Sequence, residues 1–164
     1  MIKKSRALSA MAGVLCVVAL AATAATAFAA PSKTKAKGKA DSGTVYAATT
    51  HSAGGFEYIA GQGTDKMFGS IASTYKAKVG AGSTVGTVKL TIKPVILFTS
   101  TGTLSGTSNA TLTVVSTSSA TVKGTLDLTK GTGALKGHSF VGTVTGTGDP
   151  ATGVYVFHYK GTYK

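Results

Sequence analysis

The stretch "TVKGTLDLT", residues 121 to 129, decides the fold because apolar and polar residues alternate along it. One parity carries a glycine and the apolar residues: Val122, Gly124, Leu126 and Leu128. Successive side chains of a β-strand point to opposite faces, so this pattern predicts a strand with one dry face and one face in water. The stretches 84–93 and 103–115 alternate in the same way. Such half-buried strands are typical of antiparallel sheets.

From residue 44 onward no stretch shows the helical period, and Thr, Val and aromatic residues dominate. We expect strands at 44–50, 55–61, 67–79, 84–100, 102–115, 120–129, 138–147 and 152–163. Pro94 predicts a bulge or an edge within the fourth of them. Short turns between eight strands favour a single closed antiparallel eight-stranded β-barrel, which leaves no strand edge exposed. A two-sheet β-sandwich is the alternative.

The dipeptide Gly-Thr occurs ten times, and in the clear strands its glycine lies on the apolar face. Five of these glycines recur at spacings of 20, 18, 18 and 19 residues: Gly86, Gly106, Gly124, Gly142 and Gly161. Glycine on the inner face lets strands bend and coil, as closure of a barrel requires. Chance spacing in a chain rich in Gly and Thr is the other explanation.

The first 29 residues have the pattern of a signal peptide. A basic start, "MIKKSR", is followed by an apolar run and by the small-x-small sequence Ala27-Phe28-Ala29. We expect cleavage there and an exported protein, secreted or associated with the cell envelope; a retained membrane anchor is the alternative. Cys16, the only cysteine, lies in this segment, so the mature protein has no disulfide.

Residues 30–43 are rich in lysine and contain no large apolar side chain, which predicts a flexible linker before a barrel domain at 44–164. Its lysines either attach to anionic cell-wall or membrane polymers or simply keep the segment solvated: Lys33, Lys35, Lys37 and Lys39. Without Lys3, Lys4 and Arg6 the 17 basic residues become 14, all lysine, against five acids, a net charge of +9. The absence of arginine argues against specific nucleic-acid recognition.

The ending "GVYVFHYKGTYK", residues 153 to 164, predicts an aromatic strand that closes the barrel. If Gly161 faces inward like the other glycines, then Tyr155, Phe157, Tyr159 and Tyr163 do so as well.

The stretch "KGTGALKGHSF", residues 130 to 140, together with this ending resembles the barrel shared by allene oxide cyclases and dirigent proteins. It also resembles small secreted bacterial proteins that have the same ending. The resemblance covers about the last 35 residues in detail. Lys130, Leu135 and His138 depart from the family's pattern, which has glycine, an aromatic and a small residue there. The resemblance implies an eight-stranded barrel, a homotrimer and a cavity for an apolar ligand. We expect the trimer contact at the outward Val154 and Val156.

The family's enzymes place carboxylates inside the barrel, and the alternation of each strand predicts the face on which each acid of this chain lies. Asp127 falls on the wet face, and Asp65 and Asp149 lie in turn-like sequences where Asp commonly stabilises the turn. Glu57 is the only acid that we expect inside, and only if Phe56 and Tyr58 point outward.

His138 shares the parity of Phe140 and Gly142, which places it on the inner face near a barrel mouth. It either orients a ligand, acts as a general acid or base, or is a rim residue bonded to a loop carbonyl. Three scattered histidines argue against a metal site, and no cofactor is expected.

The ligand-binding residues that we expect are the inward aromatic residues and the rim histidine: Tyr58, Tyr75, Tyr155, Phe157, Tyr159 and His138. They either line a pocket or simply fill the core. The predicted function is non-catalytic binding of a small apolar molecule or association with the cell envelope. The alternatives are a cyclase- or dirigent-like enzyme using His138 and Glu57 on an apolar or phenolic substrate, and a structural or adhesive surface protein.

Overall fold

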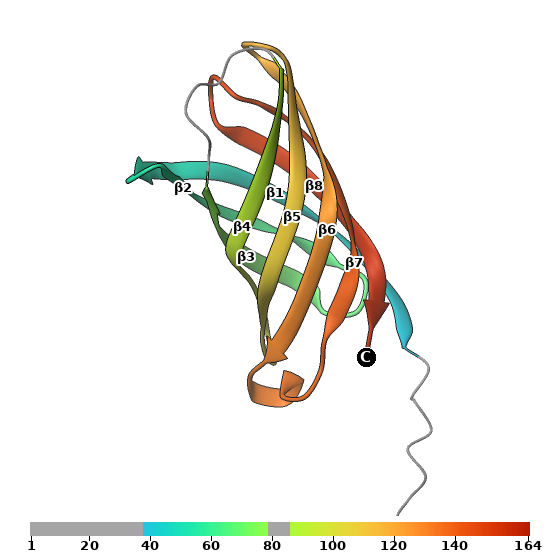
Figure 1. Cartoon of the computed structure of the whole chain (residues 1–164). Coiled ribbons are helices and arrows are strands. Elements are labelled where there is room, and N and C mark those ends of the chain that lie inside the picture. Colours follow the sequence, from blue (N-terminus) through green and yellow to red (C-terminus); the bar gives the residue numbers. More distant parts are fainter. Residues whose placement is uncertain (1–37, 79–85) are drawn as a thin grey trace, which may run out of the picture. The chain divides into compact units, whose positions relative to one another are not determined.

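A computed structural model describes residues 38–78 and 86–164 of the chain. Its eight strands close into one antiparallel barrel in which each strand pairs with its neighbours in sequence and β8 pairs with β1 (Figure 1). The elements are β1 (Lys39–Ala53), β2 (Phe56–Asp65), β3 (Gly69–Lys78), β4 (Gly86–Thr99), β5 (Gly102–Ser116), β6 (Ser119–Gly131), the 3-10 helix η1 (Gly133–Leu135), β7 (Phe140–Asp149) and β8 (Val154–Tyr163). The predicted barrel is confirmed, and the sandwich alternative is excluded.

The start of the barrel differs from the prediction. Strand β1 begins at Lys39 and pairs with β8 from Lys39 opposite Tyr163 onward, so residues 39–43 belong to the barrel and not to a linker. Backbone pairing with a strand about 120 residues away orders a segment whose own composition resembles a solvated spacer. The predicted signal peptide at 1–29 and the rest of the linker lysines, Lys33, Lys35 and Lys37, lie outside the described residues.

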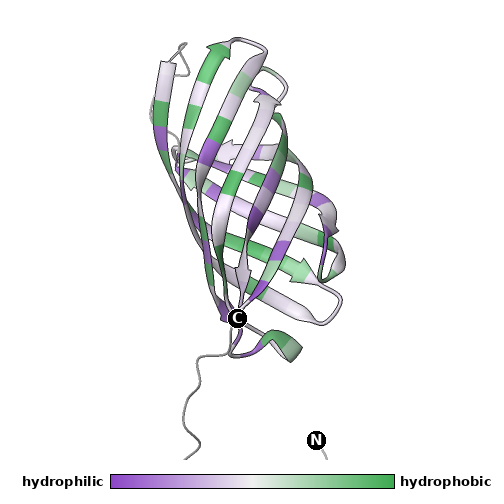
Figure 2. Cartoon of the chain, turned by 90° about the vertical axis from the view of Figure 1, so that its right-hand side faces the viewer, coloured by the Kyte–Doolittle hydropathy of each residue, from purple (hydrophilic) through white to green (hydrophobic). Residues whose placement is uncertain are grey.

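The alternation read from the sequence is the inside-outside pattern of the barrel. On β6, Val122, Leu126 and Leu128 are buried, while Lys123 and Asp127 are exposed. Figure 2 shows the same interleaving of hydrophobic and hydrophilic residues along the strands. The buried core is mostly aliphatic and includes Val45, Ile59, Ile71, Val95, Leu97, Leu104, Leu126, Leu128 and Leu135.

Strand β4 bends where the prediction placed a bulge. The register of β4 against β5 shifts between Ile92 and Val95, so Lys93 and Pro94 together lie opposite the single residue Thr107. Proline has no N–H to give to a sheet, so a bulge is the position in which it is tolerated.

The inward glycines make room for aromatic rings as well as for curvature. A Cβ at Gly146 would overlap the Phe157 ring, and a Cβ at Gly148 would overlap the ring of Tyr155. These glycines lie directly opposite those aromatic residues on β7 and β8. The aromatic strand β8 therefore depends on glycine in the strand beside it.

Candidate functional site

The middle of the barrel contains an apolar cavity. Its volume is about 50 Å³, whereas a single water molecule needs about 10–15 Å³ on this measure. The lining residues come from strands β2 to β8: Ile59, Tyr75, Ile92, Val95, Ser108, Ala110, Val122, Leu126, Val144, Phe157 and Tyr159. Ser108 supplies the one aliphatic hydroxyl, and its Oγ is buried with no hydrogen-bond partner among the described residues.

Of the predicted ligand-binding residues, Tyr75, Phe157 and Tyr159 line this cavity. The rings of Tyr75 and Phe157 meet edge to face at 5.9 Å between centroids. Phe157 stacks in turn on Tyr155, 5.8 Å away. Burial raises the pKa of the phenols of Tyr75 and Tyr155, and for Tyr155 the charges of Glu57 and Asp149 add to the effect. The phenols of these tyrosines therefore stay neutral.

Tyr58 lies on the outer face and not in the barrel. Its ring stacks on His51 of β1, with 4.3 Å between centroids, and Nζ of Lys76 lies 5.3 Å from the centroid of the Tyr58 ring. The reason is the facing of β2, in which Ile59 is buried and Tyr58 has the opposite parity. Glu57 consequently shares the inner face with Ile59, near the β1–β2 hairpin.

A buried acid that the sequence analysis assigned only to a turn lies inside the barrel. Asp65 is 5% exposed, and its Oδ1 accepts hydrogen bonds from the N–H groups of Met67 and Phe68, as a turn-stabilising Asp does. Its Oδ2 accepts a short hydrogen bond of 2.5 Å from the hydroxyl of Tyr159. Burial and this bond raise the pKa of the Tyr159 phenol, so Tyr159 remains the donor.

A second buried acid lies beside the first. Asp41 of β1 is 4% exposed; its Oδ1 accepts a hydrogen bond from the N–H of Ser42, and its Oδ2 has no partner in the described part of the chain. Burial, and next the nearby charge of Asp65, raise the pKa of the Asp41 carboxyl above its ordinary value. Asp41 therefore keeps its proton at a higher pH than an exposed aspartic acid does. The expectation of an interior with no acid other than Glu57 was wrong.

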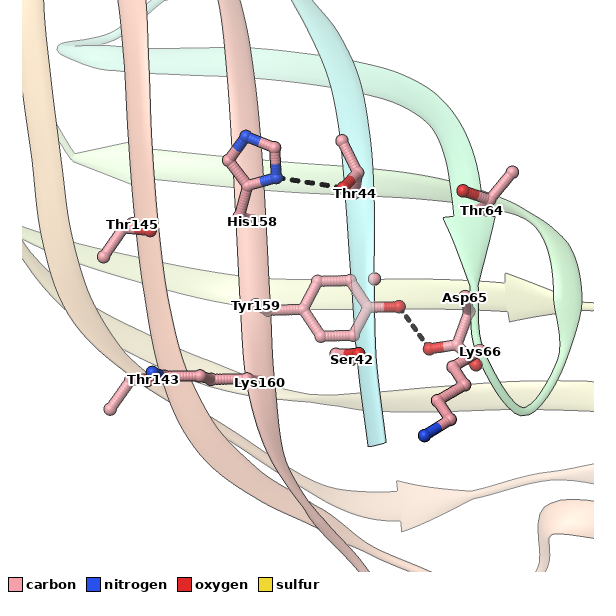
Figure 3. A pocket seen from close by; sticks show the side chains of 11 residues that line it. Ser42, Thr44, Thr64, Asp65, Lys66, Thr143, Thr145, His158, Tyr159 and Lys160 are labelled. Atoms are coloured by element: carbon pink, nitrogen blue, oxygen red, sulfur yellow. Dashed lines mark hydrogen bonds between the residues drawn. The ribbon is translucent and has the colours of Figure 1, made fainter. Parts of the chain in front are cut away.

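Glycine in the intervening strand allows Tyr159 to reach Asp65. Tyr159 of β8, Gly43 of β1 and Asp65 of β2 are direct register partners, so about 10 Å separates the backbones of β8 and β2. The ring of Tyr159 crosses the backbone of Gly43, where any Cβ would overlap its hydroxyl. Figure 3 shows the Tyr159 side chain extending across β1 to the Asp65 carboxylate. We call Asp41, Asp65 and Tyr159 the acid cluster.

His138 and Glu57, proposed together as catalytic residues, are not brought together. His138 precedes β7; its Nδ1 lies 3.0 Å from the carbonyl oxygen of Lys164, and its ring stacks on Tyr163. Glu57 lies at the start of β2, whose other end carries Asp65. The strand from Glu57 to Asp65 is about 26 Å long. Phe68, in the turn that follows Asp65, contacts Tyr163, on which His138 stacks, so Glu57 and His138 lie at opposite ends of the barrel.

The sequence contained a signal for the acid cluster. The glycine of each Gly-Thr pair faces inward, and Gly43 and Gly63 are such glycines. Asp41 and Asp65 lie two residues away from them, on the same face. Extending the glycine rule to these pairs would have placed both acids inside.

Two kinds of site are not found in residues 38–78 and 86–164. No group of three or more His, Cys, Asp or Glu side chains there could hold a metal ion. No helix in these ranges is long and apolar enough to span a membrane.

Comparison with known proteins gives no relative for this chain: no family model matches it, and no curated protein or solved structure matches it significantly.

Proposed function

We propose that the protein is an exported barrel that binds one small, mostly apolar molecule in its interior cavity without altering it. The observation that carries this proposal is the void itself, about 50 Å³ bounded by aliphatic and aromatic side chains with the unpartnered Ser108 hydroxyl at its wall. Well-packed interiors contain few voids larger than a water molecule. An apolar void attracts an apolar guest, because water gains few hydrogen bonds there.

The chemistry of the lining limits the guest. A single ring or a short alkyl chain fits the size, and a hydroxyl or carbonyl group on it would pair with Ser108 Oγ. Single-ring phenols and short-chain alcohols are therefore the first compounds to test. The resemblance to the cyclase and dirigent barrels supports the same assignment.

Filling the cavity tests the proposal. Ala110→Leu adds a side chain that occupies the void, and Asn109→Leu makes a similar change at the exposed neighbouring position. Binding of phenol and its alkylated derivatives is followed by NMR shifts of the interior methyl groups. We expect binding to be lost in the first variant and kept in the second. The proposal fails if the wild type binds none of these compounds and retains nothing from phenolic or lipid extracts.

A second candidate, an enzyme that moves a proton on an apolar or phenolic substrate, is favoured by the acid cluster. Asp41 is a buried acid with a raised pKa, and Tyr159 is a hydrogen-bonded phenol that also borders the cavity. In D₂O such an enzyme would incorporate deuterium at a carbon atom of a bound compound, and mass spectrometry detects this label after the hydroxyl groups have been exchanged back in H₂O. Asp41→Asn should stop the exchange, and Asp127→Asn, on the outer face, should not. If the wild type incorporates no deuterium into any bound compound, the enzymatic candidate fails and binding without chemistry is the function that stands.

We further propose that the barrel forms a homotrimer through its apolar outer face. Val154 is 50% exposed, and Tyr46 and Phe98 are 66% and 40% exposed on nearby strands. Exposed apolar surface of this kind commonly marks a contact with another protein. Light scattering of the wild type and of Val154→Lys tests this: a monomeric wild type contradicts it.

A further inference from the structure

The barrel separates its charges between the inner and outer faces. Two of the five acids, Asp41 and Asp65, are buried, and Glu57 has inward parity. The carboxylate of Asp149 is bound in a turn, and Asp127 faces outward. Outward parity is shared by six lysines that have register partners: Lys76, Lys78, Lys89, Lys123, Lys130 and Lys160. The outer surface consequently carries a positive potential.

Cations and hydroxyl groups on this surface are ordered by the strand register. Direct partners on successive strands from β4 to β2 form one line: Lys89, Thr111, Lys123, Thr145, His158, Thr44 and Thr64. Neighbouring strands are about 4.8 Å apart, so a basic side chain recurs about every 10 Å along the first part of this line, with a threonine between each pair.

The line passes through a groove over β7, β8, β1 and the end of β2. The groove has a volume of about 680 Å³, and its basic side chains are Lys66, His158 and Lys160 (Figure 3). Two bonds fix its walls: Thr44 Oγ1 lies 2.9 Å from Nδ1 of His158, and the Lys66 N–H donates to the carbonyl of Ser42 at 2.9 Å. A second groove of about 590 Å³ shares Lys66, Lys160, Ser42 and Thr143 with the first.

The one carboxylate in the lining of the first groove is held away from solvent. Asp65 is 5% exposed, and both of its oxygens accept hydrogen bonds from Met67, Phe68 and Tyr159. Its charge opposes an anion in the groove but is partly neutralised by these donors. The exposed side chains that an anion would touch are basic or carry a hydroxyl group.

We propose that this outer surface binds a linear polyanion, whose phosphate or carboxylate groups lie in the groove against Lys66, Lys160 and His158. The line of basic residues beyond the groove favours a chain of charges over a single small ion, because successive anionic groups meet successive cations. Threonine and serine hydroxyls between the cations donate hydrogen bonds to the oxygens of the polymer. The basic side chains of this site are exposed on the outside of the barrel, whereas the apolar cavity lies inside it, and Tyr159 is the one residue that lines both.

The experiment compares two double variants that lose the same charge. Lys66→Gln with Lys160→Gln removes the groove lysines, and Lys130→Gln with Lys136→Gln removes two exposed lysines at the end of β6 and in the following loop. Fluorescence anisotropy of end-labelled polyphosphate and of polygalacturonate measures affinity across a series of NaCl concentrations. Inorganic orthophosphate serves as the competitor.

We expect the groove variant to lose about tenfold or more in affinity for at least one polymer, and its salt slope to fall by about two, one for each lost contact. The control variant should stay close to the wild type. Equal losses in both variants would mean diffuse attraction and overturn the proposal, as would a lack of binding to both polymers. Displacement by orthophosphate at equal charge concentration would overturn the claim that the partner is a polymer.

Discussion

The barrel interior has two walls that exclude water in different ways. One wall is formed by β8, β1 and β2, and the other by β4, β5 and β6, which lie across from them in the strand order. The second wall, which we call the aliphatic wall, excludes water with side chains such as Leu97, Leu104 and Leu128. The first wall, which we call the acid wall, carries Asp41, Asp65 and Tyr159, and Asp65 and Tyr159 are joined by a hydrogen bond. The aliphatic wall loses stability when volume is removed, whereas the acid wall loses it when a hydrogen bond or a glycine is removed.

The largest effect is expected in the aliphatic wall. Leu104 has no exposed surface, so Leu104→Ala removes buried methyl groups and leaves a cavity. We expect a loss of about 2–5 kcal/mol in the free energy of unfolding, measured with urea. Ser105→Ala, at the next and outward-facing position, is the control and should change stability by less than about 1 kcal/mol. Similar losses in both variants would contradict the assigned facing of β5.

Removing one hydroxyl tests the acid wall. Tyr159→Phe keeps the ring but leaves Asp65 Oδ2 without its donor inside the barrel. A hydrogen bond to a charged group contributes about 1.5–3 kcal/mol, and we expect a loss of that size in urea unfolding. Tyr155→Phe makes the same chemical change in a tyrosine of β8 with no side-chain bond to an acid, and it should cost less. If Tyr155→Phe costs as much, the Tyr159–Asp65 bond does not distinguish the two positions.

The glycine beneath Tyr159 gives a third test. Gly43→Ala places a Cβ where the Tyr159 hydroxyl lies, so the ring must move away from Asp65. Overpacking of this kind costs about 1–3 kcal/mol. Because both changes break the same contact, the cost of Gly43→Ala should be smaller when Tyr159 is already Phe. Additive costs in this double-mutant cycle would contradict the shared contact.

The smallest effect concerns pH. The pKa of Asp41 is raised in the folded protein, so the folded state binds this proton more tightly than the unfolded state does. The resulting stability is fully present below the unfolded pKa of about 3.9 and is lost as the pH rises through the folded pKa. Asp41→Asn should remove this decline and raise the melting temperature at neutral pH. Asp127→Asn, on the outer face, should leave the decline in place; the same pH profile for wild type and Asp41→Asn would contradict the assignment.

The aliphatic wall could be predicted from sequence because it obeys a local rule. Alternation along 103–115 and 121–129 is visible without knowledge of any partner strand, and Pro94 marks its own bulge. The order of the strands then follows from the short turns, because strands joined by short turns pair with their neighbours in sequence.

The acid wall could not be predicted in the same way because its residues are defined by distant partners. Asp41 has the local composition of a solvated segment; the parity of Gly43 gives its face, but only pairing with β8 makes this segment a strand. Asp65 does stabilise its turn, as expected, but its second oxygen binds Tyr159, which is 94 residues away in sequence. The facing of Tyr58 was ambiguous because β2 is apolar on both faces around Ile59.

Closure of the barrel by β8 against β1 has a consequence for the time at which the protein folds. The two strands are the most distant pair in sequence, and until β8 is available β1 and β7 each present a row of unpaired N–H and C=O groups. A nascent chain that lacks residues 154–163 therefore has two exposed strand edges, with which other unfinished chains can pair. The closed barrel can therefore form only after β8 has been synthesised.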